Sequence, residues 1–314
     1  MALNGMYTVN IANFVLNSLQ KKLSAFLSVF ATNVSDQIVN GSSVDVAIVG
    51  TEGAAVDLGD YSDDRTNVNV SPEFSTTKKT VTLNQKPARG FYVDPWEAAK
   101  AQDGVLVASL QRKIENVTGA VALSVVEYVL NLVTTANFSN EKVINAAAFD
   151  IADVFSLRTQ ADGLEWGADD GALVLASAIW QSLCDDGAIL DKSQSGSDTL
   201  NSGNLPVLAG FNTMKNTRVP PVGGTPADQK LRGFAALPSA IAVAMRPLSA
   251  TEAFGMLPGD FGLAHEEALF DPEANVACTM TIWGAANTKR LYHCVESWYG
   301  AAVAMADQLI RVRE

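Results

Sequence analysis

The sequence predicts an α+β protein with an elongated outline, and three observations support this prediction. The stretch from Asp94 to about Thr135 has apolar residues at helical spacing along most of its length. About thirty polar residues separate two short stretches that alternate like strands. Beyond the long helix, strand and helix patterns alternate through the remainder of the 314 residues. Because such a helix reaches roughly 45 to 60 Å at 1.5 Å per residue, we expect it to be the spine of the molecule.

Composition limits the kinds of function that the chain can have. Asp plus Glu is 34 and Lys plus Arg is 22, which gives a net charge of -12 and a pI near 4.6. Such a surface repels a phosphate backbone, so tight nucleic-acid binding is disfavoured. The three cysteines are far apart without a CxxC spacing, so we expect neither a disulfide framework nor a zinc site. No apolar run approaches 18 residues, and we expect no membrane association.

The first element is an amphipathic helix from Val9 to about Phe30. Its apolar stripe comprises Ile11, Val15, Leu19, Leu23, Phe26 and Phe30. Two alternatives are equally open: the stripe packs on its own domain, or it packs on a neighbouring subunit. A membrane-surface helix is less favoured, because Lys21 and Lys22 are its only cations.

Strand alternation follows from Ser43 to Val49, and a polar excursion then begins. From Gly50 to Lys79 the chain is rich in Gly, Asp, Ser and Thr, and alternation resumes at Thr80 to Leu83 and Phe91 to Val93. A loop of this length is usually functional or disordered, so we expect an extended hairpin arm or a solvated, mobile loop. The family resemblance given below implies that such an arm would lie over an adjacent subunit, where its acids would meet cations and its tyrosine would be an anchor. The residues concerned are Asp57, Asp60, Tyr61, Asp63, Asp64 and Arg65.

The spine helix has a clear start, and Gly104 and Gly119 are its two weak points. Asp94 is suited to cap the first turn and Pro95 to occupy the first helical position. The predicted buried stripe includes Leu110, Ile114, Val117, Val121 and Tyr128. Gly119 costs up to about 1 kcal/mol relative to Ala and is a plausible bend.

The second half of the chain alternates between helices and strands. We expect a helix from Glu141 to about Gln160, a buried strand from Gly171 to Ser177 and a helix from Ala178 to Asp185. Strand patterns follow, and Ala304 to Arg313 closes the chain. These patterns cover Leu208 to Met214, Phe234 to Met245, Val276 to Trp283 and Leu291 to Val303.

The sequence gives little indication of a catalytic site. The sequence lacks GxGxxG, GxxxxGK[ST], GxSxG and HExxH, so the common nucleotide, acyl-transfer and zinc-protease sites have no anchor. A Cys-His pair built from Cys184, Cys278 or Cys294 with His265 or His293 has no local signature. We therefore expect no enzyme, no cofactor and no metal.

The order of these parts resembles the major capsid proteins of tailed bacteriophages, which have the Hong Kong 97 fold. Four strings carry the resemblance: GALVLASAIWQSLCDDG, LAGFNTMKNTRVP, LRGFAALPSAIAVAMRPL and SWYGAAVAMADQLIRV. The resemblance implies an N-terminal arm over 1–42, an E-loop hairpin over 43–93, a peripheral-domain spine over 94–142 and an axial domain over 143–250. Residues 251–314 would return through the peripheral domain, with the C-terminal end possibly in the axial domain.

By the same resemblance, the chain would assemble with itself as hexamers and pentamers into an icosahedral shell around double-stranded DNA. A scaffolding protein, a portal and a decoration protein would be its partners, in a virion assembled in the host cytoplasm. Only about forty residues precede the first strand, so no long cleavable scaffolding segment is expected. The alternatives are an encapsulin-type bacterial compartment of the same fold and, from a different class, a soluble enzyme with an unrecognised site.

Overall fold

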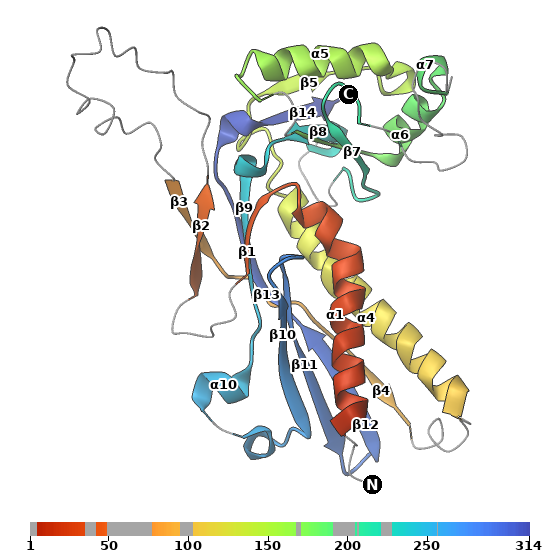
Figure 1. Ribbon diagram of the computed structural model, residues 1–314, viewed down its shortest axis with the longest axis vertical. Coiled ribbons are helices and arrows are strands. Elements are labelled where there is room, and N and C mark those ends of the chain that lie inside the picture. Colours follow the sequence, from red (N-terminus) through yellow and green to blue (C-terminus); the bar gives the residue numbers. More distant parts are fainter. Residues whose placement is uncertain are drawn as a thin grey trace, which may run out of the picture.

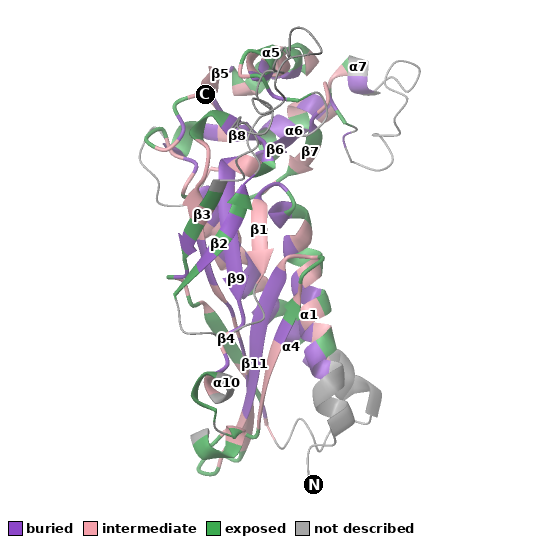
Figure 2. Cartoon of the chain, turned by 60° about the vertical axis from the view of Figure 1, so that its left-hand side comes forward, coloured by how far each residue is buried: buried purple, intermediate pink, exposed green. Residues whose placement is uncertain are grey.

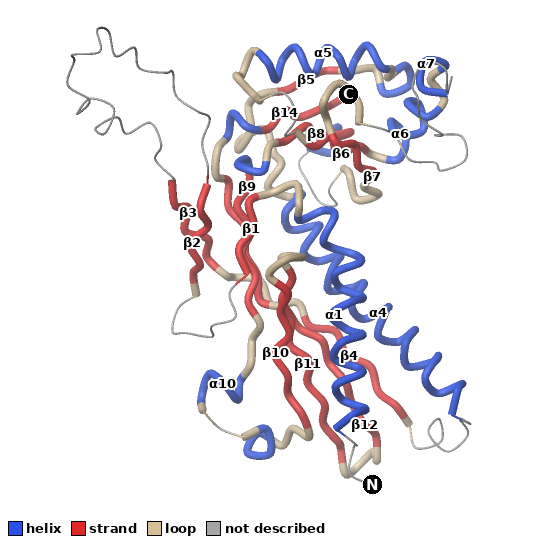
Figure 3. Tube along the Cα trace, viewed as in Figure 1, coloured by secondary structure: helices blue, strands red, loops and turns tan. Residues whose placement is uncertain are grey.

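The computed structural model describes residues 5–34, 42–48, 77–94, 103–167, 171–190, 205, 207–220, 228–255 and 257–314. In this part of the chain the molecule is elongated, with a long helical pair and its sheet at one end and a smaller α/β lobe at the other (Figure 1). The helices are α1 (Gly5–Leu27) and α4 (Asp103–Leu130), which pack along each other (Figure 3).

A four-stranded antiparallel sheet lies under the two long helices. Its order is β10-β11-β12-β4, with β10 and β4 at its edges. Both α1 and α4 contact its strands, so the sheet buries one face against the helical pair. The strands are β4 (Ala88–Val93), β10 (His265–Asp271), β11 (Val276–Ala285) and β12 (Arg290–Glu296).

The smaller lobe is a five-stranded mixed sheet with short helices around it. Its order is β5-β14-β8-β6-β7, and it has a separate apolar core that includes Trp166, Trp180 and Phe211. The strands are β5 (Glu141–Val143), β6 (Ala172–Leu175), β7 (Asn212–Lys215), β8 (Leu231–Ala236) and β14 (Leu309–Arg313). The helices are α5 (Ile151–Asp162), α6 (Ser177–Cys184) and α7 (Gly187–Leu190).

A three-stranded sheet connects the two ends of the molecule. It contains β1 (Ala31–Val34), β9 (Ile241–Arg246) and β13 (Trp298–Val303), with β9 at the centre. The chain enters β9 directly from β8 of the smaller lobe, and it enters β13 directly from β12 of the four-stranded sheet. Every residue of β9 is buried, so this strand runs through the interior (Figure 2).

A two-stranded hairpin, β2 (Ser43–Ile48) and β3 (Thr77–Thr82), lies beside the connecting sheet. On the described part of the chain the remaining short elements are α10 (Ala250–Phe254) and single 3₁₀ turns. These turns are Ala146–Ala148, Asp228–Lys230, Pro238–Ala240, Pro258–Phe261 and Ala306–Gln308.

One buried ion pair fixes the smaller lobe to the end of the spine. Arg311 of β14 is fully buried and donates to Asp228 at 3.2 Å and to the Thr135 hydroxyl at 2.6 Å. Thr135 follows α4, and its backbone N–H also donates to Asp228. Removing one partner of such a pair leaves an uncompensated buried charge, which is costly. These contacts therefore fix the position of the smaller lobe relative to the end of α4.

The N-terminal helix packs on its own chain, which decides between the two alternatives left open by the sequence. All six residues of its predicted stripe are buried, and α1 contacts α4, β10 and β11. At its middle, the Ser18 hydroxyl lies 2.7 Å from that of Thr118 on α4, and both are buried. Among the described helices, none is long and apolar enough to span a membrane.

Several predicted boundaries are wrong. The expected helix from Glu141 begins only at Ile151, where the Asp150 side chain caps it, because Glu141–Val143 pairs with β14 instead. The expected strand Phe234 to Met245 is two strands in different sheets, separated by a turn at Pro238. Leu291 to Val303 is likewise divided at Ser297.

The spine helix ends at Leu130 rather than Thr135, because Leu132 and Val133 make turn-type hydrogen bonds to Val129 and Leu130. At its other end, the predicted cap Asp94 pairs with Arg290 at 2.7 Å, and residues 95–102 lie outside the described part of the chain.

Candidate assembly surfaces

The base of the β2–β3 hairpin is held on the body of the molecule by the alternation of buried and exposed side chains along β2. Val44, Val46 and Ile48 are buried while their neighbours on β2 are exposed, so one face of the hairpin packs inward. With Val81 and Leu83 they form a separate apolar cluster against Ala242 and Ala244 of β9. Period-two alternation fixes this register, because a one-residue slip would expose all three β2 side chains.

Hydrogen bonds continue the hairpin onto the connecting sheet. Residues after β3 run beside β13, where the Gln85 and Tyr299 backbones exchange bonds of 3.0 Å in both directions. The Trp298 indole N–H donates to the Leu83 carbonyl at 3.0 Å. Gly300 lies directly against the backbone of Thr82 and Leu83, where an added Cβ would overlap the Thr82 carbonyl oxygen. The hairpin therefore leaves the body from a rigid base.

Tyrosines connect this base to the spine. The Tyr299 hydroxyl donates to the Ser124 carbonyl of α4 at 2.9 Å, and burial raises the pKa of this phenol. Tyr128 packs edge-on against Tyr299, with ring centroids 5.6 Å apart, and donates to the Asn84 side chain at 3.0 Å. The hairpin base and α4 are therefore joined by hydrogen-bonded side chains.

The spine residues singled out from the sequence lie in the main core. Leu110, Ile114, Val117 and Val121 are at most 5% exposed, and Tyr128 is half-buried against the same core. Gly119 has a packing role that the sequence did not indicate: an added Cβ would lie 3.1 Å from the Lys22 Nζ of α1. A bend at Gly119 stays a prediction.

The acidic residues of the excursion lie outside the described part of the chain. Residues 49–76 include Asp57, Asp60, Tyr61, Asp63, Asp64 and Arg65, so their role as an assembly arm stays a prediction. The described strands show where the excursion starts and ends: it leaves the body at Ile48 and returns at Thr77.

A groove of about 420 Å³ lies between α1, α4 and the end of β7 with the segment that follows it. Phe26, Ala122 and Val126 are among the apolar residues of its wall. Three cations also line it, namely Lys22, Lys215 and Arg218. This groove cannot be recognised in the sequence, because its residues come from three separate parts of the chain.

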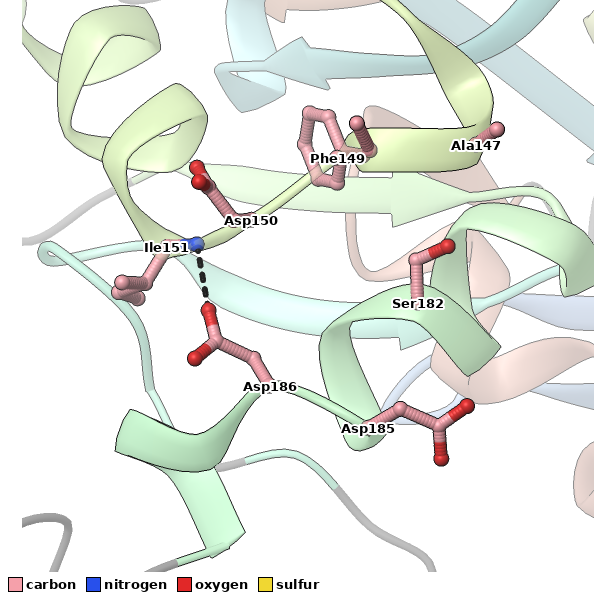
Figure 4. Close-up of a pocket in the computed structure, with 8 residues that line it drawn as sticks. Ala147, Phe149, Asp150, Ile151, Ser182, Asp185 and Asp186 are labelled. Carbon is pink, nitrogen blue, oxygen red and sulfur yellow. Dashed lines mark hydrogen bonds between the residues drawn. The ribbon is translucent and has the colours of Figure 1, made fainter.

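A second hollow of about 430 Å³ lies in the smaller lobe and is acidic (Figure 4). Two of its acids serve the first turn of α5: Asp186 accepts from the Ile151 N–H at 3.0 Å, and Asp150 accepts from the Asp153 N–H at 3.1 Å. Carboxylates at a helix N-terminus stabilise the helix, which accounts for both without a ligand. Within the described residues, no group of acids, histidines or cysteines has the arrangement of a metal site.

The described cysteines and histidines are poorly suited to nucleophilic catalysis. Burial raises the pKa of the Cys278 thiol to about 12 and that of Cys294 to about 11, so neither is an activated thiolate. Burial also raises the pKa of Cys184. The ring of His293 is buried and stacks on Phe91, with centroids 4.8 Å apart. The geometry is that of core packing.

Comparisons with known proteins identify the fold. No family model and no curated protein matches the sequence. Among solved structures, the capsid of cyanophage P-SCSP1u matches with a TM-score of 0.55 at 14% identity, covering 92% of this chain and 87% of that one. The mature capsid of bacteriophage PhiM1 matches with a TM-score of 0.52 at 10% identity, over 91% and 85%.

A virus-like particle from Pyrococcus furiosus matches with a TM-score of 0.51 at 11% identity, over 97% of this chain and 98% of that one. These likenesses confirm the predicted Hong Kong 97-like α+β fold and the resemblance to phage capsid proteins. At such low identity they define the class of fold and nothing more specific.

Proposed function

We propose that this chain is a major capsid protein that assembles as pentamers and hexamers into an icosahedral shell around double-stranded DNA. The observation that carries the proposal is the extent of the fold match, which covers at least nine-tenths of the chain in two phage capsids.

The architecture supports a structural role. The apolar residues are gathered in continuous cores, and the hairpin root is fixed to the spine by packing and hydrogen bonds. In a closed shell each subunit repeats several modest contacts, so small contact energies are multiplied. The net charge of -12 disfavours sequence-specific DNA binding and suits enclosure without adhesion.

The partners proposed on this basis are further copies of the chain, a scaffolding protein, a portal and a decoration protein. The domain division from the sequence is proposed with them: arm 1–42, E-loop 43–93, spine 94–142, axial domain 143–250 and return strands 251–314. The sheets connect these segments, since β9 pairs with both β1 and β13.

Expression of the full chain, alone and with its neighbouring viral genes, tests the proposal. We expect closed particles by negative-stain microscopy, and nuclease-resistant DNA in particles from infected cells. A small soluble oligomer without particles would contradict the shell function.

An encapsulin-type bacterial compartment of the same fold is the second candidate, since the chain also matches a virus-like particle from Pyrococcus furiosus over nearly the full length of both chains. Mass spectrometry of purified particles separates the two. A packaged protein in place of nuclease-resistant DNA would favour the compartment.

A further inference from the structure

The groove between α1 and α4 is positively charged on a strongly acidic chain. Lys22 of α1 and Lys215 of β7 are exposed, and no ion pair joins either to an acid in the described part of the chain. Arg218 is 40% exposed and lies 3.4 Å from Glu127 of α4. On a chain with a net charge of -12, two lysines that are unpaired among the described residues, beside an arginine that has one acidic neighbour, favour an anionic occupant.

The wall of the groove places a second requirement on the occupant, which must also cover apolar surface. Leu123, Val126 and Met214 line it and are only partly buried, so apolar surface is open to the occupant. A bare phosphate would leave this surface wet, whereas a peptide with carboxylates around an apolar or aromatic side chain would cover it. The fitting ligand is therefore an acidic peptide segment.

The sequence of this chain contains a segment of that chemistry. Between Asp57 and Arg65 four aspartates outnumber the single arginine, so the segment is opposite in sign to the groove, and Tyr61 stands among them. Aromatic anchors and complementary charge are the usual components of a specific contact.

The positions of hairpin and groove favour a contact between copies. In Figures 1 and 2, β2 and β3 lie on one side of β9, and α1 and α4 lie on the other side. Asp63 stands midway between Ile48 and Thr77, and an extended chain of that length reaches roughly 45 Å from its anchors. A contact from one side of a subunit to the opposite side of the next is head-to-tail, and head-to-tail contacts form a ring where the rotation between copies closes.

We propose that the acidic segment Asp57–Arg65 of one copy binds the groove lined by Lys22, Lys215 and Arg218 of the next copy. The proposal rests on the shell function and names the surface that receives the excursion. Carboxylates meet the three cations, and Tyr61 covers the apolar wall.

Charge reversal and charge exchange test the contact. The groove variant Lys22→Glu, Lys215→Glu, Arg218→Glu and the segment variant Asp60→Lys, Asp63→Lys, Asp64→Lys should each reduce particle yield at low salt at least tenfold, because attraction becomes repulsion at every repeat. The combined six-residue variant restores complementary signs and should recover most of the wild-type yield.

The matched control reverses three exposed cations that do not line the groove, Lys21, Arg112 and Lys230. This control should assemble like the wild type. Melting temperature and monomer size verify that each variant is folded. If a folded groove variant forms normal particles, or if the combined variant stays unassembled, the contact does not exist.

A second measurement separates this inference from the shell function. A synthetic peptide of residues 55–66 should bind the full-length protein in low salt, detected by fluorescence anisotropy, and should bind the groove variant at least tenfold more weakly. Equal binding to both proteins would overturn the inference even where the wild type forms shells. Wild-type protein without particles, together with groove-dependent peptide binding, would overturn the shell function alone.

Discussion

At the scale of single residues, His293 connects stability to pH. It is 1% exposed, and neither ring nitrogen has a hydrogen-bond partner among the described atoms. Burial, with a smaller contribution from the charge of Lys113, lowers the pKa of His293 to about 4. The folded chain therefore keeps the ring neutral at a pH where the unfolded chain, with a pKa near 6.5, takes up a proton.

The free energy of unfolding is accordingly expected to fall as the pH drops from 6.5 towards 4. Below pH 4, His293 should cause no further loss of stability. The full effect is roughly 3 kcal/mol. His293→Phe keeps a ring against Phe91 and should flatten this part of the pH profile in urea unfolding. His265→Phe is the control, because it removes the other histidine from a partly exposed site. Identical profiles for wild type and His293→Phe would exclude the effect.

Gly300 is the second residue with a specific consequence. An added Cβ there meets the Thr82 carbonyl and lies 3.2 Å from the Leu83 Cα, and both are backbone atoms that cannot rotate away. Gly300→Ala should therefore cost about 1–3 kcal/mol and displace the hairpin root. We expect faster proteolysis between residues 49 and 76. Gly284→Ala, where nothing lies within 4 Å of the added atom, should leave stability and proteolysis nearly unchanged.

At the scale of elements, the spine helix α4 carries the largest mutational effect. Leu110 and Val121 lie on its buried face at 5% and 1% exposure. Aspartate at either position places an unpaired charge in the core, which costs several kcal/mol of a total stability of about 5–15 kcal/mol. We expect little soluble folded protein. Gln111→Asp on the exposed face should change stability by less than about 0.5 kcal/mol. Normal yield and melting for Leu110→Asp would refute the buried stripe.

Gly119 tests whether the same helix must bend. Alanine there gains up to about 1 kcal/mol of helix propensity, offset in part by displacing the Lys22 amine. Calorimetry should show a slightly higher melting temperature, and Lys22→Ala in the same chain should release the remaining gain. If a bend at Gly119 is needed for assembly, particle yield should fall in spite of the gain in stability. Unchanged particles would rule out a bend that assembly requires.

The elements that could be predicted from the sequence are those with strong local periodicity. The α1 stripe and the buried strand β6 follow from residue spacing alone. The division of Phe234 to Met245 could not be read from periodicity, because an apolar run looks the same whether a strand stays in one sheet or enters another. Pro238 was the available signal. β10 was missed because HEEALFD has three acids in seven residues and is a strand only through its partner β11.

The two candidate surfaces, the polar excursion and the groove, also differ in whether they could be recognised in the sequence. The excursion could be recognised in the sequence because its composition changes over consecutive residues. The groove could not, because Lys22, Lys215 and Arg218 are brought together only by the packing of α1 on α4 and the approach of β7 and the segment after it. Gly119 is a similar case. The sequence predicts a bend there because the residue is a glycine, whereas the structure shows a close contact with Lys22.

At the scale of the whole molecule, a head-to-tail contact has a consequence that depends on ring size. The segment variant carries positive charge on both contact surfaces, and the groove variant carries negative charge on both. Neither should form rings alone at low salt. In an equimolar mixture, every contact is attractive only where the two variants alternate around the ring.

Strict alternation is possible in a ring of six and impossible in a ring of five. The mixture should therefore form hexamers with three copies of each variant, and pentamers should be scarce. Since closed icosahedral shells need pentamers, we expect hexameric sheets or open tubes in place of closed particles. Native mass spectrometry with one variant isotopically labelled measures the composition, and microscopy shows the assembly. Hexamers of random composition, or closed shells from the mixture, would show that these two surfaces do not meet in the ring.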